Sequence, residues 1–435
     1  MTASTSIAST PEVVMPLISE YNWDAGMRHK AQVERKPLTV RFFKNDGTDE
    51  EIPMRISLIG PVTPYRGGIA HFTTLLAGKL IDSGHDVQVV SFKKQYPAWL
   101  YPGENDKDFS PGREKVEAAY LLTPLNPFTW GKTIRKIAAF HPDEVIINWW
   151  VTFWGPAFRH VSKGLKRKGL QTAFLIHNTL PHEARAFDRN LARTTLGTAD
   201  RFIVMTEKEK SRLLSLLPDV EKIDIAPLPI YGSFKRPSSA KSILKEQLAL
   251  PEDQPILLFF GFVRPYKGLD VLIKAVKILV DEGNPVHLLV AGEIWNGKKE
   301  LEALIASLGL ENFIHIHNAY TPDDEVAAFF EVSDLFVAPY IDGTQSAALK
   351  SALGFGLPAV LTDVIVDRMV VALPDRCRVV PAGEPAALAE GIRQQLHKPR
   401  LNADQTEELT GSSWQEMLDV VGNTNPQENM KARQS

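Results

Sequence analysis

Short apolar runs and helical repeats alternate along the chain from Met54 onward. "RISLIG" reads as a buried strand, and the loop "PVTPYRGG" follows it. Apolar residues then recur at helical spacing from Ile69 to Leu80, and Gly84 ends this helix before the strand "DVQVVSF". Strand, glycine loop, helix and strand form a βαβ unit, which predicts parallel pairing.

The same alternation continues through both halves of the chain. Further strands are predicted at "EVIINWW", "TAFLIHN", "RFIVMT", "PILLFFGF", "HLLVAG", "IHIHNA", "LFVAPY", "PAVLT" and "RVVPAG". Between the halves lies "IAPLPIYGSFKRPSSA", whose Pro, Gly and Ser indicate a connector. We therefore predict an α/β fold of two Rossmann-like, doubly wound domains facing each other across a cleft, with ligands at the carboxyl ends of both sheets.

These patterns divide the chain into five segments, and "SSWQEMLDVV" predicts a helix in the last of them. The predicted segments are a flexible N-terminal extension (1–53), a first Rossmann-like domain (54–228), a connector (229–240), a second Rossmann-like domain (241–398) and a C-terminal helix with a tail (399–435).

Composition agrees with two globular domains. The 435 residues are too many for one compact core, and a net charge of -3 leaves no basic surplus to neutralise nucleic acid. Cys377 is the only cysteine, so neither an intrachain disulfide nor a thiolate metal cluster can form. No run approaches the roughly 20 apolar residues of a spanning helix, and the first residues lack the pattern of a secretory signal. We expect a cytoplasmic protein.

Two loops after predicted strands carry groups that suit an anion. In "GPVTPYRGGIAHF", Gly67 and Gly68 open a helix whose bare amides can face an anion, although a tight turn also explains them. In "GFVRPYKGLD", Arg264 and Lys267 follow a strand and could clamp a diphosphate. A solvated loop is the alternative, but the position at a strand end favours a ligand site.

Two further loops carry polar groups at strand ends. His177 ends the strand in "LIHNTLPHE" and could bind a substrate hydroxyl or share a proton, or it could simply be satisfied by backbone groups. His182 and Glu183 follow, but without helical spacing they indicate a metal only weakly. The uncharged run Gly343, Thr344, Gln345 and Ser346 lies between a strand and a helix, where it could line a phosphate pocket or only cap the helix.

Together these loops resemble the family-four group of retaining glycosyltransferases, which have a two-domain B-type fold. The resemblance covers about residues 54–395. It rests on "PYRGGIAHFTTLLAGKLIDSGHDVQVV", "FFGFVRPYKGLDVLIKAV", "HLLVAGE", "SDLFVAPY" and "HNTLPHE".

The resemblance implies a role for each candidate residue. Arg264 and Lys267 would hold the diphosphate of a nucleotide-sugar donor, and His177 would lie against the donor sugar near the reacting carbon. The first domain would be the acceptor side. Gly67 and Gly68 would approach the phosphate and the transferred sugar, and the donor pocket would be lined by Gly343, Thr344, Gln345 and Ser346.

One departure from the family pattern leaves the donor open. The family commonly has two glutamates eight residues apart, and alignment on "GFGLPAV" places Gly343 and Ser351 at these positions. "TQSA" resembles the "TQSG" of some members, so we interpret the loss as a feature of a subgroup. The neighbouring Asp342 could partly substitute for the first glutamate.

The implied activity is transfer of a sugar from a nucleotide diphosphate, with retention, to a polysaccharide, glycolipid or small molecule. We expect neither metal nor cofactor, because no aspartate pair of the metal-bridging kind stands near the motifs and cations would stabilise the leaving diphosphate. A non-catalytic nucleotide-sugar-binding protein and a nucleotide-sugar epimerase stay open. Residues 148–169 combine aromatics with a basic helix, which could rest on an anionic membrane or form a core strand and a solvated helix.

Overall fold

The computed structural model describes residues 15–16, 37–38, 53–97, 106–110, 113–181, 185–232, 240–294 and 297–422. It divides the chain into two compact units, Met1–Ile52 and Pro53–Ser435. In the first unit, β1 (Met15–Pro16) pairs antiparallel with β2 (Pro37–Leu38). Most of the extension predicted at 1–53 lies outside the described residues.

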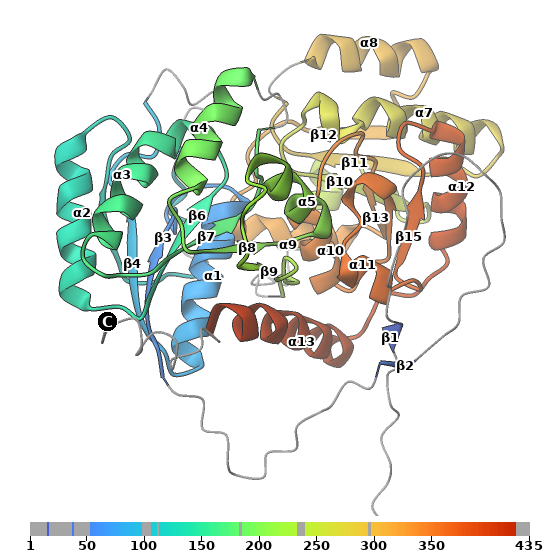
Figure 1. The fold of residues 1–435 in the computed structure, drawn as a ribbon. Helices are drawn as coiled ribbons and strands as arrows, with labels where there is room; N and C mark the ends of the chain where they lie inside the picture. Colours follow the sequence, from blue (N-terminus) through green and yellow to red (C-terminus); the bar gives the residue numbers. More distant parts are fainter. Residues whose placement is uncertain are drawn as a thin grey trace, which may run out of the picture. The chain divides into compact units, whose positions relative to one another are not determined.

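The unit Pro53–Ser435 contains two parallel sheets, each covered by helices (Figure 1). We call each sheet with its helices a lobe. The strands of the first lobe are, in sheet order, β5 (Ala118–Leu122), β4 (Asp86–Phe92), β3 (Arg55–Ile59), β6 (Glu144–Trp149), β7 (Thr172–Ile176), β8 (Arg201–Val204) and β9 (Ile223–Ile225). Its helices are α1 (Gly68–Asp82), α2 (Pro127–Phe140), the short η1 (Thr152–Trp154), α3 (Gly155–Lys166), α4 (Ala186–Leu196) and α5 (Glu207–Leu216).

The second lobe repeats this arrangement. Its strands are, in sheet order, β12 (Ile314–His317), β11 (His287–Ala291), β10 (Ile256–Phe260), β13 (Leu335–Ala338), β14 (Ala359–Thr362) and β15 (Cys377–Val380). Its helices are α6 (Ala240–Gln247), η2 (Pro265–Lys267), α7 (Leu269–Asp281), α8 (Lys298–Leu308), α9 (Asp323–Val332), α10 (Ala347–Gly354), η3 (Asp363–Ile365), α11 (Arg368–Ala372) and α12 (Pro385–Gln395).

Burial of the central strands explains why the sequence predicts them so clearly. Every residue of β6, β7, β11, β13 and β14 is buried. A parallel sheet covered on both faces requires such continuous apolar runs. Within the two parallel sheets, the apolar pattern did not predict β5 and β9, which are half-exposed edge strands with weaker apolar runs.

Both sheets reverse their strand order at one point. The first lobe reverses between β3 and β6, and the second between β10 and β13. Ligands of doubly wound sheets bind outside the carboxyl ends of the strands at this switch point. The topology therefore places the loops after β3, β10 and β13 at the expected binding edges.

The last described helix, α13 (Ala403–Gly422), returns from the second lobe to the first (Figure 1). It packs against α10 and α1. Trp414 is buried in the first lobe's core, stacks on Phe72 and donates its indole N–H to the carbonyl of Ile230 at 3.0 Å. The predicted C-terminal helix is thus present, and it joins the two lobes.

The aromatics of segment 148–169 are core residues. Trp149, Trp150, Trp154 and Phe158 are buried in the first lobe, whereas the basic side chains of α3, Arg159 among them, are exposed. The structure therefore favours a core strand followed by a solvated basic helix, and membrane contact stays a prediction. No helix in the described part of the chain is long and apolar enough to cross a bilayer.

Candidate functional site

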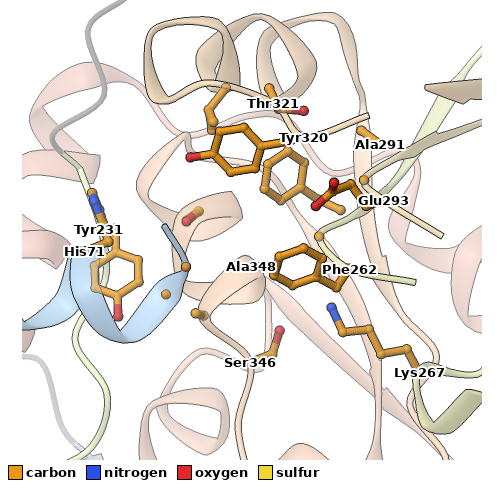
Figure 2. A pocket seen from close by; sticks show the side chains of 18 of the residues that line it. His71, Tyr231, Phe262, Lys267, Ala291, Glu293, Tyr320, Thr321, Ser346 and Ala348 are labelled. Carbon is orange, nitrogen blue, oxygen red and sulfur yellow. The ribbon is translucent and has the colours of Figure 1, made fainter. Parts of the chain in front are cut away.

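A cavity of about 320 Å³ lies between the two lobes of the unit Pro53–Ser435. The first lobe contributes the start of α1, and the second contributes residues from the loops that follow β10, β11, β12 and β13 (Figure 2). The cavity therefore occupies the edge where the switch points of both sheets place a ligand.

The cavity brings together five of the nine predicted site residues. Its walls include Gly67, Gly68, Lys267, Gln345 and Ser346. Of the other four, Arg264, Gly343 and Thr344 lie in the same loops without lining the cavity, whereas His177 follows β7, whose described loop residues do not line it. His182 and Glu183 lie outside the described residues.

Two helices begin at the cavity from opposite lobes. Gly67 precedes α1 without a side-chain cap, while the hydroxyl of Ser346 caps α10 by accepting from the Leu349 N–H at 3.2 Å. A Cβ atom on Gly68 would lie 3.4 Å from the Cβ of Ala347, so the two helix starts nearly touch. Their positive dipole ends and unpaired amides therefore converge on one space, which favours an anion.

Lys267 adds a cation to this space. Its ammonium lies 5.5 Å from the ring centroid of Tyr340 and 6.0 Å from that of Phe259. No ion pair to a carboxylate of the described residues neutralises it. Burial lowers the pKa of Lys267, which the neighbouring Tyr266 partly opposes and Arg264 reinforces. A half-buried cation with a lowered pKa gains from an anionic ligand.

Arg264 is exposed at the start of η2, three residues before Lys267. The η2 turn is tied to the loop after β13, because the Ile341 N–H donates to the carbonyl of Tyr266 at 2.8 Å. The loop that carries Arg264 and Lys267 and the uncharged loop after β13 therefore form one continuous wall of the second lobe.

His177 is buried behind the cavity. Its Nε2 lies 2.9 Å from Asn148 Oδ1, and its ring meets Phe72 edge-on. Because Asn148 Nδ2 donates to the carbonyl of Ile59, Oδ1 faces the histidine and Nε2–H is the donor. Burial lowers the pKa of His177 to about 3, so the imidazole is neutral near pH 7. Its link to the cavity is its carbonyl, which accepts from Gln345 Nε2 at 3.1 Å.

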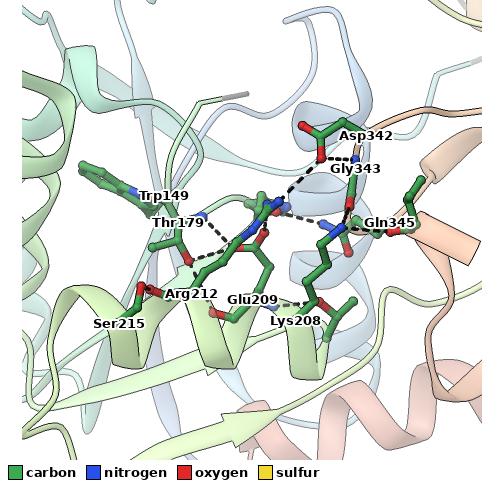
Figure 3. Close-up of polar contacts among 12 residues, drawn as sticks. Trp149, Thr179, Lys208, Glu209, Arg212, Ser215, Asp342, Gly343 and Gln345 are labelled. Carbon is green, nitrogen blue, oxygen red and sulfur yellow. Dashed lines mark hydrogen bonds and ion pairs between the residues drawn. The ribbon is translucent and has the colours of Figure 1, made fainter. Parts of the chain in front are cut away.

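Helix α5 of the first lobe holds the uncharged loop of the second (Figure 3). Lys208 Nζ donates to the carbonyl of Gly343 at 2.7 Å, and Arg212 pairs with Asp342 at 3.6 Å. Arg212 is itself fixed by the fully buried carboxylate of Glu209 at 2.9 Å. The sequence did not reveal these contacts, because Lys208 and Arg212 have the pattern of an ordinary charged helix surface.

The surroundings of Gly343 and Ser351 show what stands at the positions of the family's two glutamates. Gly343 has φ +150°, and a Cβ there would lie 2.9 Å from Ile365 Cγ2, so a larger side chain would displace Ile365. Ser351 is buried and lines the cavity. Asp342 accepts from the Gly343 N–H at 2.8 Å and pairs with Arg212, and it does not line the cavity.

The buried polar atoms that lack a hydrogen-bond partner among the described residues include four from the cavity wall that are central to the site. They are Tyr231 Oη, Glu293 Oε2, Thr321 Oγ1 and Gln345 Oε1. Buried polar groups are nearly always hydrogen-bonded, so unpaired ones gathered in one cavity indicate groups that a ligand satisfies. Burial raises the pKa of Tyr231, which keeps its hydroxyl protonated as a donor.

Sequence reasoning missed three of these four residues. Glu293 follows the predicted strand "HLLVAG", and Thr321 follows the predicted strand "IHIHNA". Their positions after strand ends could therefore have indicated a ligand site. Tyr231 lies in the connector and gave no such signal. Within the described part of the chain, no cluster of three His, Cys, Asp or Glu is suited to hold a metal ion.

Family models match both lobes. The Glycosyltransferase Family 4 model matches residues 66–230, and the Glycosyl transferases group 1 model matches residues 240–410, so that together they span most of the chain. The chain belongs to glycosyltransferase family 4. The fold and the family predicted from the sequence are therefore confirmed, and the fold is the B-type glycosyltransferase fold.

Relatives of this family-4 glycosyltransferase include both sequences and solved structures. The D-inositol 3-phosphate glycosyltransferase of Streptomyces avermitilis is 27% identical over 374 residues, covering 79% of this chain and 78% of the relative. Sucrose-phosphate synthase from Thermosynechococcus elongatus superposes with a TM-score of 0.59 at 18% identity, covering 88% of this chain and 98% of the other. HepE of Anabaena, solved in complex with UDP-glucose, superposes with a TM-score of 0.61 at 16% identity, covering 87% and 100%.

Proposed function

We propose that this family-4 glycosyltransferase moves a sugar from a nucleotide-diphosphate donor to an acceptor with retained anomeric configuration. The observation that carries the proposal is the convergence of Lys267 with the starts of α1 and α10 in one cavity. A diphosphate is the multiply charged anion that such a site suits. A relative of the same fold, HepE, was solved with UDP-glucose, which supports a nucleotide-sugar donor.

Catalysis in this proposal is electrostatic. The bond between the anomeric carbon and the diphosphate oxygen breaks, and the diphosphate leaves with the electron pair. An acceptor hydroxyl oxygen bonds to the same carbon, and its proton passes to the departing diphosphate. Lys267, Arg264 and the two helix starts stabilise this developing charge, and groups of this kind contribute about 3 kcal/mol each in a water-excluded site. The cavity walls come from both lobes, so closure of the lobes would exclude water.

The glycine pair at the start of α1 and the uncharged loop after β13 shape the pocket for the donor. Gly67 and Gly68 permit close approach of the donor, while Gln345 and Ser346 offer neutral hydrogen bonds to the sugar. The loop carries no carboxylate at Gly343, so it does not repel the diphosphate. His177, whose imidazole is neutral, supports this wall through its backbone carbonyl, which accepts a hydrogen bond from Gln345 Nε2.

Substitution of both cations tests the proposed clamp. Arg264→Ala combined with Lys267→Ala should abolish transfer from a panel of UDP and GDP sugars, because the leaving group loses its positive partners. Circular dichroism should show an unchanged fold. Lys274→Ala, which removes an exposed lysine of α7, is the matched control and should keep full activity. Turnover that survives the double substitution would contradict the clamp.

A non-catalytic nucleotide-sugar-binding protein is the second candidate. The observation that favours it is the absence of a carboxylate at both Gly343 and Ser351. Saturable binding of a nucleotide sugar, with no turnover over a broad panel of acceptors, would support binding alone.

A further inference from the structure

Glu293 is a carboxylate in the cavity to which the proposed reaction assigns no role. It stands two residues after the end of β11 and lines the same cavity as Lys267. Its Oε2 atom is buried and has no hydrogen-bond partner, and no cation of the described residues pairs with it. A buried acceptor without a partner is strongly unfavourable, so this atom is expected to receive a hydrogen bond from a ligand.

The backbone around Glu293 is fixed by neighbours on both sides. Gly292 has φ +147°, and a Cβ there would lie 2.3 Å from the carbonyl oxygen of Gly261, so only glycine allows this close approach. The Glu293 carbonyl accepts from the Val263 N–H at 2.9 Å, and the Ile294 N–H donates to Asn318 Oδ1 at 2.8 Å. The side chain therefore leaves the sheet edge at a defined point.

Charge decides which part of a nucleoside diphosphate can face this side chain. A carboxylate only accepts hydrogen bonds, and it repels phosphate. The diphosphate has its own partners in Lys267 and the two helix starts. The ribose, by contrast, is uncharged and offers two adjacent hydroxyls as donors, which match the two oxygens of one carboxylate.

The position of Glu293 in the cavity agrees with a contact to ribose hydroxyls. Figure 2 shows Glu293 on the same wall as Lys267, on the side nearer to Tyr320. This order suits a ligand that runs from phosphate through ribose toward the base. By chain order β11 is the second strand of its sheet. An acidic residue associated with that part of a doubly wound domain binds ribose in dinucleotide-binding proteins.

We propose that Glu293 binds the ribose hydroxyls of the nucleotide and thereby makes the site specific for ribonucleotides. The inference rests on the proposed function. It also supplies an acid to a site that lacks carboxylates at Gly343 and Ser351.

Isothermal titration with ribo- and deoxyribonucleotides tests the inference. Wild-type protein is titrated with UDP, GDP and ADP, and the ligand that binds best is compared with its 2′-deoxy form. Because hydrogen bonds to a charged group are strong, the ribonucleotide should bind at least about tenfold more tightly. In Glu293→Ala and Glu293→Gln this preference should fall to about twofold, while Glu300→Gln, an exposed acid at the start of α8, should keep it.

The outcomes separate this inference from the proposed function. If wild type binds a nucleoside diphosphate and both Glu293 variants keep the full preference for ribose, the inference fails and the proposed function stands. Equal weakening of both ligands would assign Glu293 a structural role and also overturn it. A wild-type protein that binds none of the three diphosphates overturns the proposed function together with the inference.

Discussion

Burial shifts the pKa of two residues around the cavity. It lowers the pKa of Lys267 and that of His177, but with opposite consequences. Lys267 lines the cavity, so a bound diphosphate would favour its protonated form. His177 is buried behind the cavity, and the pKa of its imidazole is about 3, so the imidazole stays neutral at physiological pH. Charge at this site is therefore concentrated on the lysine.

The buried histidine predicts a pH dependence of stability. The unfolded chain protonates His177 near pH 6.5, whereas the folded chain does not until about pH 3. Acid therefore favours the unfolded state across this window, and stability is lost as the pH falls. Between pH 7.5 and 5.5 this residue should account for about 1.4 kcal/mol of lost stability.

Urea unfolding at both pH values measures this effect. His177→Gln should lose about 1.4 kcal/mol less than wild type over the same interval. His397→Gln removes an exposed histidine and should behave as wild type. Equal pH dependence in wild type and His177→Gln would show that the buried imidazole takes up a proton in the folded state.

The site residues that the sequence predicted share one property. Gly67, Gly68 and Lys267 are residue types whose function at a strand end follows from backbone freedom or charge. Tyr231 was missed because its evidence is an unpaired polar atom in a shared wall, which exists only after folding. Glu293 was missed although it follows a predicted strand, because a single glutamate there does not by itself indicate a ligand. Their residue types alone are common at ordinary surfaces.

At the scale of elements, α5 positions a loop that belongs to the other lobe. Lys208→Ala removes the 2.7 Å contact with the Gly343 carbonyl. Loss of a charge-assisted hydrogen bond of this kind should lower kcat/KM for the donor about tenfold. The loss should appear in steady-state kinetics with varied donor.

Two variants make the comparison specific. Lys208→Arg should recover most of the activity, because arginine can reach the same carbonyl. Lys210→Ala removes a lysine two residues along the same helix, which should leave the kinetics unchanged. Unaltered donor kinetics in Lys208→Ala would mean that the loop keeps its shape without α5.

Elements were predictable where burial was complete. The central strands of both sheets follow the apolar runs in the sequence, and α1 begins at the predicted glycine pair. The edge strands β5 and β9 were not, because half-exposed positions weaken the apolar signal. The contacts between α5 and the loop after β13 join residues 130 or 135 positions apart, which no local pattern encodes.

At the scale of the whole molecule, α13 links the end of the described chain to its first lobe. Trp414 is buried in a core that includes residues of β3 and α1. Trp414→Ala should therefore destabilise the protein by about 3 to 5 kcal/mol through loss of apolar contacts and creation of a cavity. The first lobe should be affected although the substitution lies near the other end of the sequence.

Hydrogen exchange locates this effect. Amides of residues 54–82 should exchange faster in Trp414→Ala than in wild type. Gln415→Ala, an exposed neighbour on α13, should leave exchange unchanged. Unchanged protection of residues 54–82 in Trp414→Ala would show that the first lobe is stable without this contact.

The contacts of α5 with the loop from Asp342 to Gln345 also constrain which sequence changes this protein can accept. The two lobes are a matched pair, since Lys208 and Arg212 fit one particular loop shape. A chimera that inherits its halves from different parents would break this fit even if each half folded well. Substitutions that reshape this loop are therefore expected to require matching changes at Lys208 and Arg212.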